Sequence, residues 1–120
     1  MSALESFRAL GEELGLAFAM VEHLLRTYGA ETPAIYSACR ERRELMTQLH
    51  PDHPAIEAEV IHAARREFAV TADDVLLRRT HVSLETRDGG LAARARVTEL
   101  LARELPPPRV AVAGTAGDSP

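Results

Sequence analysis

Two histidines lie close together in the segment His50-Pro51-Asp52-His53-Pro54. Imidazole and carboxylate side chains are common ligands of zinc and iron, so this segment could contribute to a metal site. A turn with two prolines does not hold side chains in a fixed array, and no third ligand is obvious nearby. We therefore expect polar turn residues with local hydrogen bonds here, and we predict no metal site.

A second group with possible chemistry is Glu59, His62 and Arg66, which follow one another at helical spacing. A carboxylate beside an imidazole raises its proton affinity, so Glu59 and His62 could form an acid/base pair. Charge partners on one helix face are mostly structural, however. We predict no catalytic residue in this chain.

The densest charged group is Asp73-Asp74 followed by Arg78-Arg79. Adjacent side chains on a helix point about 100° apart, so one arginine can pair with the aspartates while the other faces a partner. Three interpretations stay open: a solvated helix face, a salt bridge to another domain or subunit, and a small-anion site formed by Arg78 and Arg79.

Composition limits the class of protein. The chain has 120 residues, enough for one domain, and its 14 basic residues are all arginine against 18 acidic residues. The absence of lysine excludes Schiff-base catalysis and a P-loop lysine, and the net charge of −4 argues against nucleic-acid binding. The single cysteine, Cys39, excludes an internal disulfide and zinc sites built on several thiolates.

The N-terminal residues do not resemble a signal peptide, and no apolar run reaches the roughly 20 residues of a membrane span. We therefore expect a cytoplasmic chain. Aromatic residues make up only 4% of the sequence, with no tryptophan, so the core will be thin and dependence on a partner surface is plausible.

Apolar periodicity predicts an all-α fold, a small orthogonal bundle of five or six helices over residues 1–105. The expected helices are Ala3 to Leu10, Leu14 to Tyr28 with Gly29 as C-cap, Thr32-Pro33 to about Glu44, Ile56 to Phe68, Ala72 to Arg79, and a last one carrying Ala93 to Leu105. Leu45 to Leu49 could extend the third helix or form a turn. The segment Thr80 to Glu85 is too short to assign as a strand.

Turn and cap signals separate these helices. His50 to Pro54 is a helix breaker, Thr71 and Asp74 have the spacing of a capping box, and Asp88-Gly89-Gly90 is a turn rather than a nucleotide-binding loop. Pro106-Pro107-Pro108 ends the last helix. Residues 106–120, rich in Pro, Ala and Gly, are predicted to be a disordered tail.

Four blocks of sequence resemble one known family: His23 to Gly29, Leu49 to Asp52, Glu57 to Ala69, and Thr71 with Asp74 to Thr80. In order and spacing they are similar to the C-terminal helical (cap) domain of the FAD-dependent glycerol-3-phosphate dehydrogenases and alpha-glycerophosphate oxidases. The resemblance extends over about residues 16–105. Its most specific part is the acidic residue followed by a short apolar step and Arg-Arg-Thr.

The resemblance implies a parent enzyme that converts sn-glycerol 3-phosphate to dihydroxyacetone phosphate, reduces FAD and passes electrons to membrane quinone or oxygen. The flavin and substrate sites of that family belong mainly to a larger N-terminal domain. It implies no cofactor in this chain, no activity of the chain alone, and a flavin-binding domain as partner, in cis or in trans. A homo-oligomer and a peripheral place at the inner membrane through the parent enzyme are further expectations.

The family positions carried over to this sequence are Glu67, Asp74, Arg78, Arg79 and Thr80. We expect them to make contacts within the domain and with its partner. The sequence departs from the family at His62, where a tyrosine is usual, at Phe68, where methionine is frequent, and at His81. The alternative function is a free-standing helical interaction module that keeps the cap fold.

Overall fold

The computed structural model describes residues 2–104. Its elements are α1 (Ala3–Leu14), α2 (Phe18–Tyr28), the 3₁₀ turn η1 (Gly29–Glu31), α3 (Thr32–Glu41), the 3₁₀ turn η2 (Arg43–Met46), β1 (Gln48–His50), β2 (His53–Ile56), α4 (Ala58–Arg66), the π-helical η3 (Asp74–Arg79), α5 (Val82–Glu85) and α6 (Leu91–Glu104). The predicted all-α bundle is confirmed, with one short strand pair added. The predicted tail, 106–120, lies outside the described residues.

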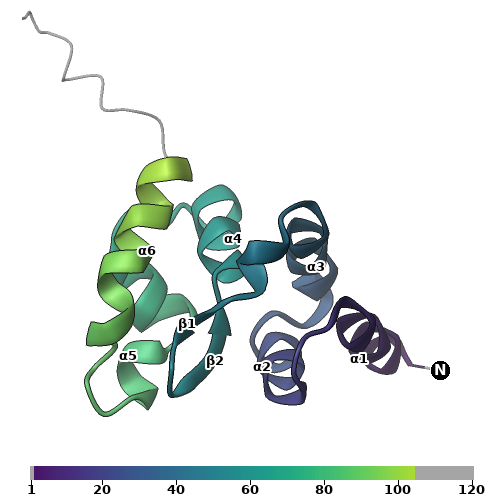
Figure 1. Cartoon of the computed structure of the whole chain (residues 1–120). Helices are drawn as coiled ribbons and strands as arrows, with labels where there is room; N and C mark the ends of the chain where they lie inside the picture. The colour runs from purple at the N-terminus through teal and green to yellow at the C-terminus, as the bar shows by residue number, and fades with distance from the viewer. Residues whose placement is uncertain (1, 105–120) are drawn as a thin grey trace, which may run out of the picture.

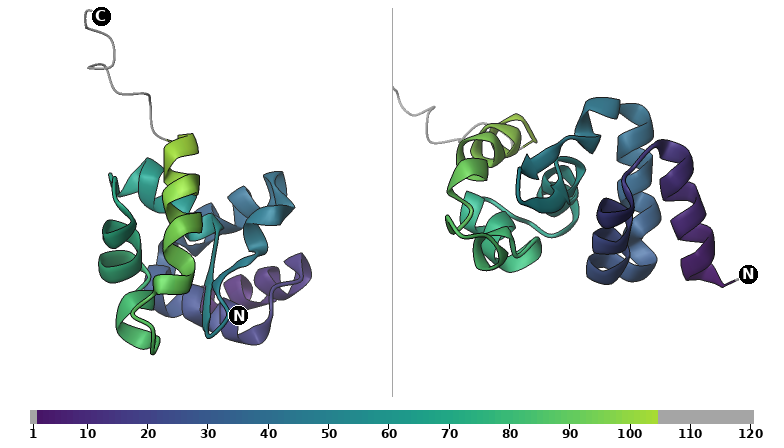
Figure 2. Two further views of the ribbon diagram at one scale, coloured as in Figure 1. Left: turned by 60° about the vertical axis from the view of Figure 1, so that its left-hand side comes forward. Right: turned by 60° about the horizontal axis from the view of Figure 1, so that its bottom comes forward.

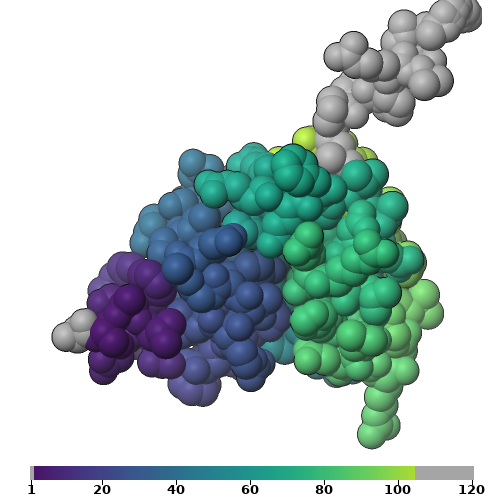
Figure 3. Space-filling model, turned by 180° about the vertical axis from the view of Figure 1, so that it is seen from behind, coloured from purple at the N-terminus to yellow at the C-terminus, as the bar shows by residue number. Residues whose placement is uncertain are grey.

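The chain forms two halves that lie side by side (Figure 1). Helices α1, α2 and α3 make up one half, α4 to α6 make up the other, and the β1–β2 hairpin lies between them. Figure 2 shows the same division from two further directions. From behind, the surface passes from the N-terminal helices to the C-terminal half, with the residues around α4 along the top (Figure 3).

Each half has its own apolar core, and α4 contributes to both. Ala58 and Ile61 pack with the N-terminal core, whereas Val60 and Ala63 pack with the C-terminal core. Every residue from Ala58 to Ala63 is buried. The helix is therefore covered on all sides in this stretch, and any polar side chain in it needs a partner.

The N-terminal helix is longer than predicted. It passes Leu10 and ends at Leu14, where Gly15 adopts a left-handed φ of 98°. Gly11 is not a breaker: a Cβ there would lie 2.6 Å from Tyr36 Oη, so the glycine allows α1 to approach α3 closely. Phe18 begins α2 but is 69% exposed, contrary to its predicted place on the apolar face.

Helix α3 begins and ends near its predicted limits. Thr32 is the first residue of the helix, and its hydroxyl does not cap the helix but donates to the carbonyl of Gly29 (2.7 Å). The helix ends at Glu41 rather than Glu44. The following turn η2 then buries Leu45 in the N-terminal core.

The segment His50 to Pro54 does break the helical pattern, but it does so as the turn of an antiparallel hairpin that the sequence did not predict. Gln48 is opposite Ile56 and His50 is opposite His53. The strands are only three and four residues long, so they carry too little alternation to be recognised.

The predicted helix from Ile56 to Phe68 is shorter at both ends. Ile56 belongs to β2 but remains fully buried, while Phe68 follows the helix with a φ of 59° and is 85% exposed. The next helical segment does end at Arg79, and α5 then occupies the stretch that sequence alone left unassigned. Helix α6 confirms the last predicted helix over its described residues.

The capping box at Thr71 and Asp74 is present. The backbone N–H of Asp74 donates to Thr71 Oγ1 (3.2 Å), and the N–H of Thr71 donates to Asp74 Oδ2 (3.0 Å). These reciprocal bonds satisfy donors at the start of the helical segment that carries Arg78 and Arg79. Between residues 2 and 104, no helix is both long and apolar enough to cross a membrane.

Candidate functional site

The segment that joins α4 to α5 carries all five of the family positions. In it, Asp74 is first of all a cap: besides Thr71, it accepts the backbone N–H of Val70 (2.9 Å). These two backbone bonds are the main reason that the pKa of the Asp74 carboxyl lies below its usual value. The expected pair with Arg78 also forms, at 3.9 Å.

Thr80 is a structural residue of the same segment. Its hydroxyl is buried, donates to the carbonyl of Val75 (3.0 Å) and accepts the N–H of Val82 (3.4 Å). These contacts fix the passage from η3 to α5. Thr80 therefore makes contacts within the domain.

Glu67 and Arg79 form an ion pair of 3.5 Å between Oε1 and Nε. Together with Asp74, Arg78 and Phe68 they line a small pocket of about 140 Å³. The side chain of Arg78 is 74% exposed and Phe68 is 85% exposed. We call the exposed side chains of Phe68, Arg78 and Arg79 the motif surface.

A buried carboxylate network, which sequence reasoning missed, lies between the two halves. Glu59 is completely buried. Its carboxylate accepts three hydrogen bonds, from Tyr28 Oη (2.8 Å), His23 Nε2 (2.8 Å) and the N–H of Ile56 (2.7 Å). Burial, and after it the charge of Glu59, raises the pKa of Tyr28 far above its ordinary value. The network ties α2, β2 and α4 together.

Glu59 and His62 do not form the acid/base pair that their helical spacing allows. Glu59 points to α2, while His62 Nε2 bonds Glu31 Oε1 at 3.1 Å and the His62 ring meets the ring of Tyr28 edge to face. Because α4 is buried against both halves, Glu59 and His62 project toward different neighbours. The periodicity of a single sequence does not show that a helix is buried on two sides, so it could not reveal these partners.

The two hairpin histidines make separate contacts. His50 Nε2 bonds Asp88 (2.8 Å) and His53 Nε2 bonds Glu85 (2.7 Å), and each Nδ1 accepts a backbone N–H two residues further on (3.0 and 3.1 Å). The bond to His53 is the main cause that lowers the pKa of Glu85. The expected local turn hydrogen bonds are therefore confirmed, together with a carboxylate partner for each ring.

Cys39 belongs to the N-terminal core, where burial raises the pKa of its thiol to about 11. A thiol with so high a pKa is a poor nucleophile at neutral pH. Among the described residues, one group offers three potential metal-ligand atoms close together: Glu31, His62 and Glu67.

The structure is that of a small helical domain whose buried polar groups hold its two halves together and which exposes Arg78 and Arg79 on the segment that joins α4 to α5. Residues 3–106 match the family of the C-terminal domain of alpha-glycerophosphate oxidase. The chain belongs to this family.

Curated relatives agree with this assignment. The glycerol-3-phosphate dehydrogenase of Synechocystis sp. is 33% identical over 81 residues, which cover 68% of this chain and 15% of the relative. The mitochondrial glycerol-3-phosphate dehydrogenase of Mus musculus is 33% identical over 100 residues, covering 80% of this chain and 14% of the relative. A probable mitochondrial glycerol-3-phosphate dehydrogenase of Dictyostelium discoideum is 31% identical over 83 residues, covering 69% and 13%. No solved structure matches the chain.

Proposed function

We propose that this chain is the C-terminal helical domain of an FAD-dependent glycerol-3-phosphate dehydrogenase, that it packs against a flavin-binding domain in cis or in trans, and that it has no activity alone. The observation that carries this proposal is the family match over 3–106, combined with a match to only 13 to 15% of each relative named above. Most of each relative lies outside the match and has room for the catalytic sites.

The reaction proposed for the whole enzyme is oxidation of sn-glycerol 3-phosphate to dihydroxyacetone phosphate, with reduction of FAD. It rests on the names of the relatives, which are glycerol-3-phosphate dehydrogenases. Membrane quinone or oxygen would then reoxidise the flavin. The chain would act in the cytoplasm or, through its parent enzyme, at the surface of the inner membrane.

The glycine pair of this chain fits poorly as a pyrophosphate cradle, which supports a flavin site in another domain. The N–H of Gly90 already donates to Thr86 Oγ1 and Asp88 Oδ1, both at 2.9 Å. A Cβ on Gly90 would lie 2.8 Å from Ser83 Oγ, so this glycine serves close packing inside the domain. A dinucleotide loop needs free backbone N–H groups at the start of a helix.

The motif surface supports a docking role. Aromatic side chains and arginine are enriched in protein interfaces and provide much of their binding energy. Phe68 and Arg78 are largely exposed here and line the same pocket, while Asp74 and Glu67 form ion pairs with Arg78 and Arg79. A flavin-binding domain resting on this segment would cover them.

A chimera tests the proposed function. The segment of the Synechocystis dehydrogenase that matches this chain would be replaced by the chain, and oxidation of glycerol 3-phosphate would be measured with an artificial electron acceptor. We expect activity in the chimera, and neither activity nor flavin absorbance in the purified chain alone.

The control is the same dehydrogenase with its own segment rejoined through the same junctions. An active control with an inactive chimera would contradict the proposal and favour the free-standing interaction module. A yellow, flavin-loaded chain would contradict the assignment of the flavin site to another domain.

A further inference from the structure

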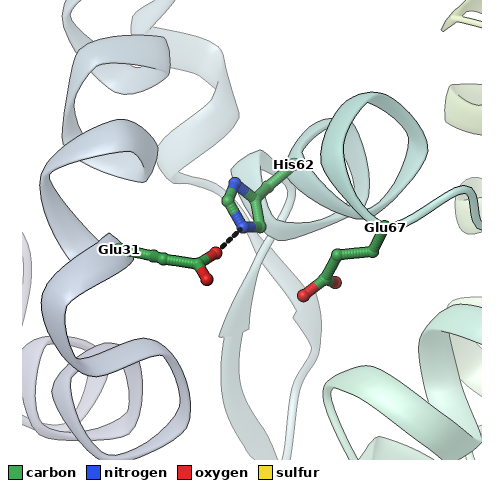
Figure 4. A group of neighbouring side chains, drawn as sticks. All are labelled: Glu31, His62 and Glu67. Carbon is green, nitrogen blue, oxygen red and sulfur yellow. Dashed lines mark hydrogen bonds and ion pairs between the residues drawn. The ribbon is translucent and has the colours of Figure 1, made fainter.

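Three side chains from separate places in the sequence converge beside α4 (Figure 4). Glu31 comes from η1, His62 from the middle of α4, and Glu67 from the C-cap of that helix. Figure 4 shows the Glu31 carboxylate at the imidazole of His62, with the side chain of Glu67 on the other side of the ring. One ligand atom from each residue lies within 4.8 Å of the others.

One of these residues carries a carboxylate oxygen that lacks a hydrogen-bond partner. Glu67 Oε1 is buried, and it is the sole buried side-chain nitrogen or oxygen without a hydrogen bond among residues 2–104. Arg79 Nε, at 3.5 Å, offers charge but not hydrogen-bond geometry. A buried carboxylate oxygen without a bond is costly, and a bound cation is one way in which proteins satisfy such an atom.

The ligand chemistry selects the kind of cation. The imidazole of His62 is only 4% exposed and points Nε2 at Glu31 Oε1, 3.1 Å away. One imidazole and two carboxylates suit a divalent first-row transition metal, whereas calcium and magnesium prefer sites made of oxygen alone. We propose that Glu31, His62 and Glu67 form a binding site for a divalent transition metal ion such as Zn²⁺.

Binding needs only small adjustments of the side chains. Metal–ligand bonds of about 2.0–2.2 Å require the three ligand atoms to move closer together. Glu31 can do so because its side chain is 61% exposed. The metal binds His62 Nε2, and the single proton of the neutral ring then lies on Nδ1. Water completes the coordination.

The charges around the three ligands are mixed, because Arg65 and Arg66 line the pocket beside His62, and Arg65 pairs with Glu104. Two carboxylates and the guanidinium of Arg79 give the group a net negative charge before a metal binds. The bound ion would connect η1 in the N-terminal half to the end of α4, directly before the motif surface. It would therefore stabilise the junction of the two halves by RT ln(1 + c/Kd), where c is the free metal concentration and Kd its dissociation constant.

Cobalt(II) is the probe, because its visible absorption reports a protein ligand field. We expect the purified full-length chain to bind one equivalent of Co²⁺, with displacement by Zn²⁺. His62→Gln and Glu67→Gln should each weaken binding by more than the roughly 10–100-fold that loss of an outer-shell partner costs. Circular dichroism would establish that both variants are folded.

Glu85→Gln is the matched control, because Glu85 is also an exposed glutamate bonded to a buried histidine, His53. This variant should leave Co²⁺ binding unchanged. Absence of saturable Co²⁺ binding would overturn the proposal, as would unchanged binding in folded His62→Gln and Glu67→Gln. The experiment uses the isolated chain, so its outcome is independent of docking to a flavin domain.

Discussion

Glu59 is the single residue on which the junction of the two halves depends most. It is completely buried, and its two oxygens accept bonds from α2 and from the backbone of β2. A buried ionised group is tolerated only when its bonds are made, so the three donors and the carboxylate form one unit.

Replacing Glu59 by glutamine should destabilise the domain by about 3 kcal/mol, because a neutral amide no longer matches three donors in a buried site. Urea unfolding followed by circular dichroism would measure the loss. Glu13→Gln, at an exposed position of α1, should change the stability by no more than about 0.5 kcal/mol. A Glu59→Gln variant as stable as Glu13→Gln would contradict the assigned role.

Asp88 should make stability depend on pH. Its pKa lies well below the ordinary value of 3.8, chiefly because the N–H of Ala92 donates to it, with further bonds from His50, Gly90 and Thr86. A carboxyl group with a lowered folded pKa stabilises the protein above its unfolded pKa, and this contribution is lost as the pH falls toward the folded pKa.

We therefore expect Asp88→Asn to melt at a lower temperature than the wild type at pH 7, with a difference that shrinks below about pH 4. Thermal unfolding at a series of pH values would show this. A constant difference across the series would mean that the charge of Asp88 does not contribute.

The sequence identified the motif residues of the candidate site but not the partners of its buried polar side chains. The resemblance identified Glu67, Asp74, Arg78, Arg79 and Thr80, and the structure places all five on one segment. It could not identify the partners of Glu59, because His23 and Tyr28 come from another helix and approach only through tertiary packing. The Glu31–His62 contact was hidden for the same reason.

At the scale of the element, Gly11 shows how a residue that weakens an isolated helix can be required in a packed one. It lies inside α1, where a Cβ would meet Tyr36 Oη at 2.6 Å and Val21 Cγ2 at 2.8 Å. The Tyr36 hydroxyl also donates to the carbonyl of Phe7 (2.8 Å), which holds α1 and α3 together.

Gly11→Ala should therefore destabilise the domain by roughly 1–3 kcal/mol through overpacking, although alanine has the higher helix propensity. Urea unfolding would measure the effect. Tyr36→Phe removes the atom nearest to the added Cβ. The double variant Gly11→Ala/Tyr36→Phe should therefore lose less stability than the sum of the losses in the two single variants. A stabilising Gly11→Ala variant would show that α1 is free to move away.

Elements with local signals were predicted well, and elements that depend on distant contacts were not. The Thr71–Asp74 capping box and α6 carry their information within a few residues. The β1–β2 hairpin does not, because its histidines are held by Asp88 and Glu85, which lie 38 and 32 residues further along the chain. Phe68 was assigned to a helix by periodicity, but Glu67 ends that helix and leaves the aromatic ring exposed.

In the whole molecule, two separate apolar cores share α4, whereas the sequence led us to expect one. The exposed motif surface is then available to a larger neighbour. Loss of interface aromatic and arginine side chains commonly weakens binding strongly, whereas exposed positions contribute little to the fold itself.

The double variant Phe68→Ser/Arg78→Ala should bind the Synechocystis dehydrogenase lacking its matching segment roughly tenfold or more weakly than the unaltered chain does. Isothermal titration calorimetry would measure this. Arg103→Ala, which removes an exposed arginine of α6, is the control and should bind normally. Equal affinities of the double variant and the unaltered chain would place the docking face elsewhere.

Hydrogen exchange is the sharpest test of whether this domain packs against a flavin-binding domain through the motif surface. Exchange of the backbone amides would be compared between the isolated chain and the chimera with the dehydrogenase. We predict slower exchange in the chimera over residues 67–79, with little change in α1. Unchanged exchange over 67–79 in an active chimera would contradict this prediction.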